Sequence, residues 1–197
     1  MESRQPTTLG DAPDADTIVI GVGSPLMGDD GTGLVALEAL RSGWDFEPAL
    51  ELLDGGTWGM NLLPFIESAS RVLLLDAIQA RREPGAVIRL EGDEIPRFFA
   101  TKLSPHQIDL KEVLALAELR ETLPEQLVVL GIEPAAIEMS ASLSEPVQEA
   151  MPGLLADVVE QLESWGYRAV PRSKKSTTPE SSEYTAPTMS SFPSATD

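Results

Sequence analysis

The feature that most constrains this fold is a series of short apolar runs separated by amphipathic segments. The runs are too short for buried helices and are rich in branched residues, which indicates strands buried on both faces. A further run, 85–92, alternates apolar and polar residues and is predicted to be an edge strand. The predicted buried strands are residues 17–23, 71–78 and 126–134, and residues 50–54 are predicted to form a further strand.

Amphipathic segments between these runs predict the helices. The first has Leu34, Val35, Leu37 and Leu40 facing inward and Gly43 as its C-terminal stop. The other predicted helices are 58–70, with Pro64 as a weak point, 108–123, and a long closing helix at 144–165. Strand–helix alternation of this kind predicts an α/β three-layer sandwich, with a mostly parallel twisted sheet and helices on both faces.

The two ends of the chain have a different composition from the middle. Residues 1–16 are polar and acidic, and residues 172–197 are rich in Ser, Thr and Pro without periodicity. Both are predicted to be disordered tails around one folded domain, 17–171.

Charge and cysteine content narrow the class of protein. The formal net charge of −18 disfavours nucleic acid and anionic membranes as partners, although acidity that only maintains solubility remains an equal alternative. The absence of cysteine excludes disulfides, thiolate metal sites and a cysteine nucleophile. The N-terminal residues lack the apolar core of a signal peptide, so a cytoplasmic location is expected. Nothing indicates a self-association surface, so we expect a monomer.

Acidic side chains and the one histidine follow the predicted strands. In parallel sheets, ligands bind beyond the carboxyl ends of the strands, so these loops are where chemistry is expected. The polar residues concerned are Asp29 and Asp30 in the loop 21–33, Asp54 in the stretch Asp54-Gly55-Gly56-Thr57, Asp76, and His106 just before the predicted helix.

Several site types fit such a set. Carboxylates with an imidazole suit a divalent ion such as zinc or nickel, with coordination positions left open. Alternatively, Asp30 and Asp54 cap helices, Asp76 anchors a turn and His106 is a solvated loop residue. A dinucleotide site is disfavoured, because Leu26 replaces the third glycine and two carboxylates lie where a pyrophosphate would bind. A serine hydrolase lacks its nucleophile elbow, and a glycosidase lacks aromatic residues in the loops.

Five segments, in unbroken order over residues 17–170, resemble the successive motifs of the hydrogenase maturation endopeptidases. One position departs from the family pattern: Ser24, followed by Pro25, stands where asparagine is usual, which affects the expected geometry of that loop. The segments are GVGSPLMGDDGTG, LLDGGTWGMNLL, LLLDAI, SPHQIDLKEVLALAEL and VVLGIEP.

The resemblance implies a peptidase domain at 17–171 that removes a C-terminal extension from the large-subunit precursor of nickel–iron hydrogenase after nickel insertion. It implies Asp30, Asp76 and His106 as the catalytic and metal-contacting residues, and the stretch 54–57 as a substrate loop. The Ni²⁺ would arrive with the substrate, and another ion such as Zn²⁺ would substitute for it. If the ion serves only recognition, a carboxylate acts as base or nucleophile, as in an aspartyl protease. A non-catalytic chaperone that docks on the metal-loaded subunit is the alternative.

Overall fold

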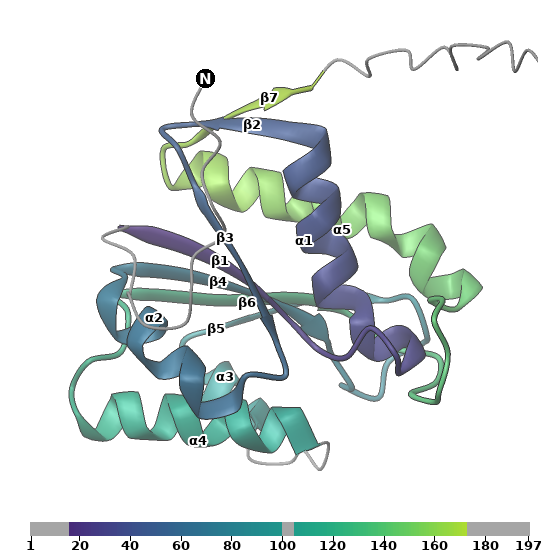
Figure 1. Ribbon diagram of the computed structural model, residues 1–197, viewed down its shortest axis with the longest axis horizontal. Coiled ribbons are helices and arrows are strands. Elements are labelled where there is room, and N and C mark those ends of the chain that lie inside the picture. Colours follow the sequence, from purple (N-terminus) through teal and green to yellow (C-terminus); the bar gives the residue numbers. More distant parts are fainter. Residues whose placement is uncertain (1–15, 100–104, 173–197) are drawn as a thin grey trace, which may run out of the picture.

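A five-stranded sheet forms the centre of the molecule (Figure 1). The computed structural model describes residues 16–99 and 105–172, and the side chains of 97–99 and 105–109 lie outside the described part. The strand order is β3-β1-β4-β6-β5, and all neighbours are parallel except the edge strand β5, which is antiparallel to β6. The strands are β1 (Thr17–Val22), β3 (Glu51–Gly56), β4 (Arg71–Ala77), β5 (Val87–Glu91) and β6 (Gln126–Ile132).

Helices cover both faces of this sheet (Figure 1). One face is covered by α1 (Thr32–Gly43) and α5 (Glu145–Ser164), and the other by α2 (Leu63–Ser68), α3 (Glu94–Phe99) and α4 (Pro105–Leu119). Beside the first face, β2 (Trp44–Glu47) and β7 (Arg168–Pro171) form a separate antiparallel pair. The predicted three-layer α/β class is confirmed.

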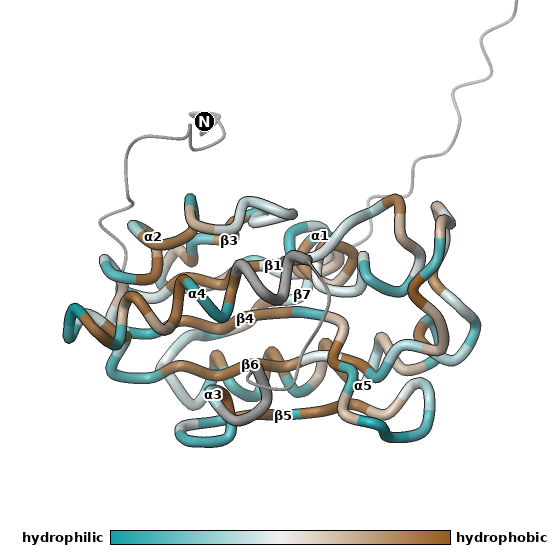
Figure 2. The backbone as a smooth tube through the Cα atoms, turned by 90° about the horizontal axis from the view of Figure 1, so that it is seen from below, coloured by the Kyte–Doolittle hydropathy of each residue, from teal (hydrophilic) through white to brown (hydrophobic). Residues whose placement is uncertain are grey.

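The alternation of side chains along the central strands produces two cores. Ile18 and Ile20 of β1 pack toward α2 and α4, whereas Val19 packs toward α1 and α5. Figure 2 shows the hydrophobic colour concentrated along the central strands, with mixed colours on the helices. Since β1 and β4 are buried along almost their whole length, their sequences read as continuous apolar runs.

Close packing at Gly33 brings the start of α1 against the ends of two strands. A Cβ atom at Gly33 would lie 2.1 Å from the carbonyl oxygen of Leu75 in β4 and 2.5 Å from that of Val22 in β1. No side chain fits there, so glycine allows the helix to begin directly beside the carboxyl ends of both strands. The short 3₁₀ helix η1 (Gly28–Gly31) just before α1 contacts β4 as a result.

Several predicted details are wrong. Val35 is 43% exposed, and Ala36 takes the inward position on α1. The helix predicted at 58–70 is divided into the 3₁₀ helix η2 (Gly59–Leu62) and α2. Pro64 is the second residue of α2 and not a mid-helix weakness, because an N–H group there has no partner within the helix.

Helix α4 begins at Pro105, three residues before the predicted start. His106 is therefore in the first turn of a helix and not in the loop before it. Proline is favoured at the first helical position, which accounts for the earlier start. Helix α3 and strands β2 and β7 were not predicted from the sequence.

The predicted tails fall almost entirely outside the described residues, and their disorder stays a prediction. Asp16, the last residue assigned to the first tail, is described: its carbonyl accepts a hydrogen bond from the Arg71 amide at 3.0 Å, and its carboxylate pairs with the Arg71 guanidinium. Within 16–99 and 105–172, no helix is both long and apolar enough to cross a membrane.

Candidate functional site

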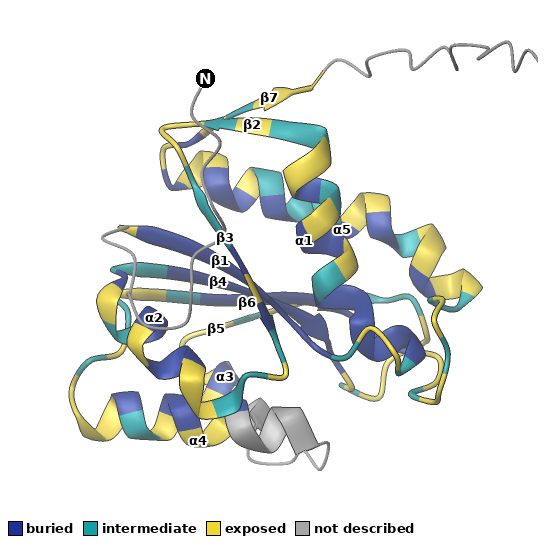
Figure 3. Cartoon of the chain, in the orientation of Figure 1, coloured by how far each residue is buried: buried dark blue, intermediate teal, exposed yellow. Residues whose placement is uncertain are grey.

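Asp30 and Asp76 are buried on neighbouring segments at the carboxyl ends of the parallel strands. Asp76 lies near the end of β4 and is 1% exposed, and Asp30 lies in η1, after β1, and is 3% exposed. Because β1 and β4 are adjacent and η1 contacts β4, the two carboxylates belong to one region of the fold. Figure 3 shows this end of the sheet buried in dark blue beneath largely exposed loops.

Backbone amides hold the two carboxylates. The Ser24 amide donates to Asp30 Oδ2 at 2.8 Å, and the Ala77 amide donates to Asp76 Oδ1 at 2.8 Å. Residue 24 is the position that departs from the family pattern. Since its contact with Asp30 is made by the main chain, serine can fill the position while this hydrogen bond is kept.

The alternative that Asp30 and Asp54 are helix caps is wrong. Gly31 is the N-cap residue of α1, and no side-chain cap hydrogen bond forms there. Asp54 lies within β3 and is exposed, directly opposite Gly21 of β1. In the predicted substrate loop, Gly55 is buried and Thr57 is exposed, so the loop carries polar side chains at the surface.

His106 is the second residue of α4, and its side chain lies outside the described part. The helix contacts η2, which follows β3, and it begins at the end of the molecule where the parallel strands finish (Figure 1). Among the described side chains, which leave out that of His106, no group of three or more metal-binding residues occurs. The predicted set Asp30, Asp76 and His106 therefore stays a prediction.

Asp29 has a different environment from its neighbour Asp30. Its carboxylate accepts hydrogen bonds from the amides of Ala135 at 2.8 Å and Ala136 at 3.2 Å, and from the Ser144 amide at 2.6 Å and hydroxyl at 2.8 Å. The side chain is 1% exposed. Asp29 thus fastens the loop that contains Asp30 to the segment between β6 and α5.

Glu133 is a second buried carboxylate with a fastening role. It follows β6, and its Oε2 atom accepts hydrogen bonds from the amides of Ala80 at 2.7 Å and Arg82 at 3.1 Å. These amides belong to the loop after β4, a few residues beyond Asp76. Segment 133–144 is consequently bonded to the loop that contains Asp30 and to the loop that follows Asp76.

The structural roles of Asp29 and Glu133 were not predicted from the sequence. Glu133 offered one signal: a charged residue directly after a buried apolar strand needs partners, because an unpaired buried carboxylate is costly. Asp29 offered no such signal, since its partners lie more than 100 residues away along the chain.

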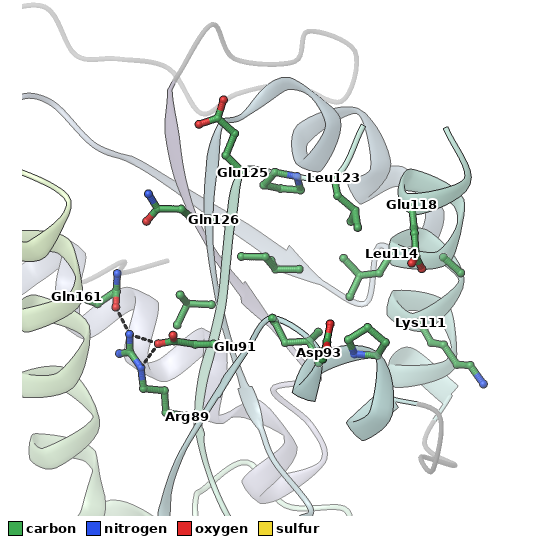
Figure 4. Close-up of a pocket in the computed structure, with 17 residues that line it drawn as sticks. Arg89, Glu91, Asp93, Lys111, Leu114, Glu118, Leu123, Glu125, Gln126 and Gln161 are labelled. Carbon is green, nitrogen blue, oxygen red and sulfur yellow. Dashed lines mark hydrogen bonds and ion pairs between the residues drawn. The ribbon is translucent and has the colours of Figure 1, made fainter. Parts of the chain in front are cut away.

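A cavity of about 560 Å³ lies elsewhere, between β5, β6, α3 and α4 (Figure 4). It is lined by Gln126 and Leu127 at the start of β6 and by Leu114 and Glu118 toward the end of α4. At its edge, Arg89 bonds to Glu91 and Gln161. The cavity is at the amino end of the parallel strands, opposite the candidate site.

Comparison with known proteins identifies the family of this chain. A family model described as hydrogenase maturation protease matches residues 35–161, which include Asp76 and His106. The Rhizobium leguminosarum bv. viciae hydrogenase expression/formation protein HupD is 34% identical, over 88% of this chain and 87% of its own length. The Escherichia coli K12 hydrogenase 2 maturation protease is 33% identical, over 79% of this chain and 95% of its own.

A solved structure has the same fold. The E. coli hydrogenase maturating endopeptidase HybD superposes with a TM-score of 0.76 at 32% identity, covering 79% of this chain and 97% of the neighbour. The family model covers more than half of the chain, and both relatives exceed 30% identity over most of their lengths. The chain belongs to the hydrogenase maturation protease family.

Proposed function

We propose that this protein is an endopeptidase that removes the C-terminal extension of the nickel–iron hydrogenase large-subunit precursor after nickel has been inserted. The observation that carries this proposal is the pair of buried carboxylates, Asp30 and Asp76, where adjacent parallel strands end. Family membership and the names of the relatives, among them a hydrogenase 2 maturation protease, give the kind of substrate.

The nickel is part of the substrate in this proposal. Asp30, Asp76 and His106 contact the ion that the precursor already holds, and they thereby distinguish loaded from empty precursor. Two carboxylates and an imidazole are donors that nickel or zinc accepts. Buried carboxylates need compensating partners. A positively charged ion is a suitable partner for them beside the amides that already donate to them.

Two alternative mechanisms could cleave the peptide bond at such a site, one in which the ion takes part in the chemistry and one in which it serves only recognition. The ion of the substrate polarises the scissile carbonyl and lowers the pKa of an attacking water. If the ion serves only recognition, Asp30 or Asp76 acts as the general base. The stretch 54–57, with Asp54 and Thr57 at the surface, is proposed to contact the extension.

The test measures the mass of the large subunit after incubation with this protein. Purified precursor is prepared with and without nickel, and the intact mass of each is followed by mass spectrometry. The proposal predicts loss of a C-terminal fragment from the nickel-loaded precursor alone. A stable complex with unchanged precursor mass would instead favour the chaperone alternative, and equal cleavage of nickel-free precursor would contradict the recognition of nickel.

A further inference from the structure

Two large apolar side chains are exposed on loops at the carboxyl end of the sheet. Leu26, in the loop after β1, is 67% exposed, and Met139, in the loop after β6, is 89% exposed. Single exposed apolar residues are common on protein surfaces and need no explanation. These two differ, because the backbone places them next to one another beside the candidate site.

A short parallel bridge joins the two loops, with Met27 paired to Ser140. The Ser140 amide donates to the Leu26 carbonyl at 3.1 Å, and the Gly28 amide donates to the Ser140 carbonyl at 2.8 Å. Leu26 and Met139 each precede a bridged residue by one position. The two exposed side chains are thus carried by directly neighbouring backbone segments, and the pair is called here the Leu26–Met139 ridge.

The Leu26–Met139 ridge is held firmly relative to Asp30. Leu26 precedes Asp30 by four residues, and Met139 lies within the segment whose ends, at Ala135 and Ser144, bond to Asp29. Loops whose backbone is already held by hydrogen bonds lose little backbone conformational entropy when a partner binds. The methionine side chain also adapts its shape to different apolar partners.

We propose that the Leu26–Met139 ridge is the docking surface for an apolar segment of the precursor adjacent to the cleaved bond. The inference rests on the proposed function. A peptide whose scissile bond reaches Asp30 and Asp76 must lie along the carboxyl end of the sheet, where the loops that carry Leu26 and Met139 also lie. The loop 135–139, AAIEM, is apolar at four of its five positions, so an uncharged apolar segment fits it.

The test uses the double variant Leu26→Ser/Met139→Ser with nickel-loaded precursor. Both side chains are exposed, so the substitutions leave the core intact. We expect KM to rise roughly tenfold or more, the size expected when two large apolar side chains lose their burial, with kcat changed by less than about twofold. The conservative variant Leu26→Met/Met139→Leu should retain the wild-type KM.

The matched control is Leu119→Ser. Leu119 is 80% exposed, but it lies at the end of α4, away from the candidate site. An unchanged KM in the double variant, or an equal rise in the control, would overturn the proposal for the ridge while leaving the proposed function intact.

Isothermal titration calorimetry of the same variants with the precursor gives a readout that does not depend on cleavage. If the wild-type protein binds the precursor without cleaving it, the proposed function is wrong. The ratio of the wild-type affinity for the precursor to that of the double variant still decides the role of the ridge. A roughly tenfold weaker affinity of the double variant supports the ridge, and equal affinity refutes it. If the wild-type protein neither binds nor cleaves, both proposals are wrong.

Discussion

Ser144 donates two hydrogen bonds to the carboxylate of Asp29, one from its amide to Oδ1 at 2.6 Å and one from its hydroxyl to Oδ2 at 2.8 Å. Burial raises the pKa of Asp29, but these bonds and those from the amides of Ala135 and Ala136 outweigh burial and lower the pKa below its ordinary value. Asp29 is therefore a buried, ionised acceptor that ties the β1 loop to the start of α5.

The first prediction concerns Asp29→Asn. The amide side chain keeps the shape but replaces one acceptor with a donor, so buried N–H groups lose their partner. We expect a loss of about 1–3 kcal/mol in the free energy of unfolding, measured by urea denaturation. Because Asp30 is the next residue, kcat/KM for the precursor should also fall. Asp93→Asn, at an exposed position, is the control, and equal stability of both variants would refute the fastening role.

The second prediction concerns Glu133→Ala. Removal of this carboxylate takes away the acceptor of the Arg82 amide and the closer of the two acceptors of the Ala80 amide, which also donates to the Ile78 carbonyl at 3.1 Å. We expect amide hydrogen exchange at these two positions to accelerate, while exchange in the central strands stays slow. Cleavage of the precursor should slow as well, because the loop after Asp76 is less ordered. Unchanged exchange at both amides would show that Glu133 does not hold this loop.

The third prediction compares Gly33→Ala with Gly43→Ala, at opposite ends of α1. A methyl group at Gly33 overlaps the carbonyl oxygens of Leu75 and Val22, so α1 must move away from the strands, at a cost of about 1–3 kcal/mol. Nothing lies within 4 Å of a Cβ atom at Gly43, where alanine should be neutral or stabilise the protein by about 0.4–1 kcal/mol. Thermal and urea unfolding of the two variants measure this contrast. Equal stabilities would contradict the packing described.

The fourth prediction concerns Asp16. A hydrogen bond from the Arg71 guanidinium, with a smaller one from Ser70, lowers the pKa of the Asp16 carboxyl. Since the folded pKa is depressed, the stabilisation is complete above the unfolded pKa and is lost as the pH falls through the folded value. A carboxyl ¹³C NMR titration should show the low pKa in the wild-type protein and a value nearer the ordinary one in Arg71→Gln. A wild-type titration at the ordinary value would contradict the pairing.

The buried strands could be predicted because their pattern is local. Strands such as β4 are apolar along nearly their whole length, and a parallel sheet covered on both faces is the arrangement that buries such strands. The pair β2 and β7 could not be predicted, because Trp44 pairs with Pro171, more than 120 residues later. Four residues carry too little pattern to indicate a partner at that distance.

The site was predictable in part for a related reason. Asp76 was predicted at the carboxyl edge of the sheet because it lies near the end of a predicted strand. The family resemblance indicates Asp30, and not Asp29, as the metal-contacting residue. From the residues alone the two adjacent aspartates are equivalent, and only tertiary contacts with Ala135, Ala136 and Ser144 give Asp29 its structural role. The start of α4 at Pro105, which places His106 on a helix, depends on the packing of α4 against η2 as well as on local pattern.

The most direct test of the central claim is cleavage of nickel-loaded precursor by Asp30→Asn, Asp76→Asn and His106→Ala, with Asp93→Asn as the control. Circular dichroism establishes that each variant is folded, and intact mass spectrometry follows the large subunit. If the three side chains act together on the nickel of the substrate, all three variants leave the precursor at full length while the control shortens it at the wild-type rate. A folded variant of any of the three that removes the extension at the wild-type rate would contradict the account.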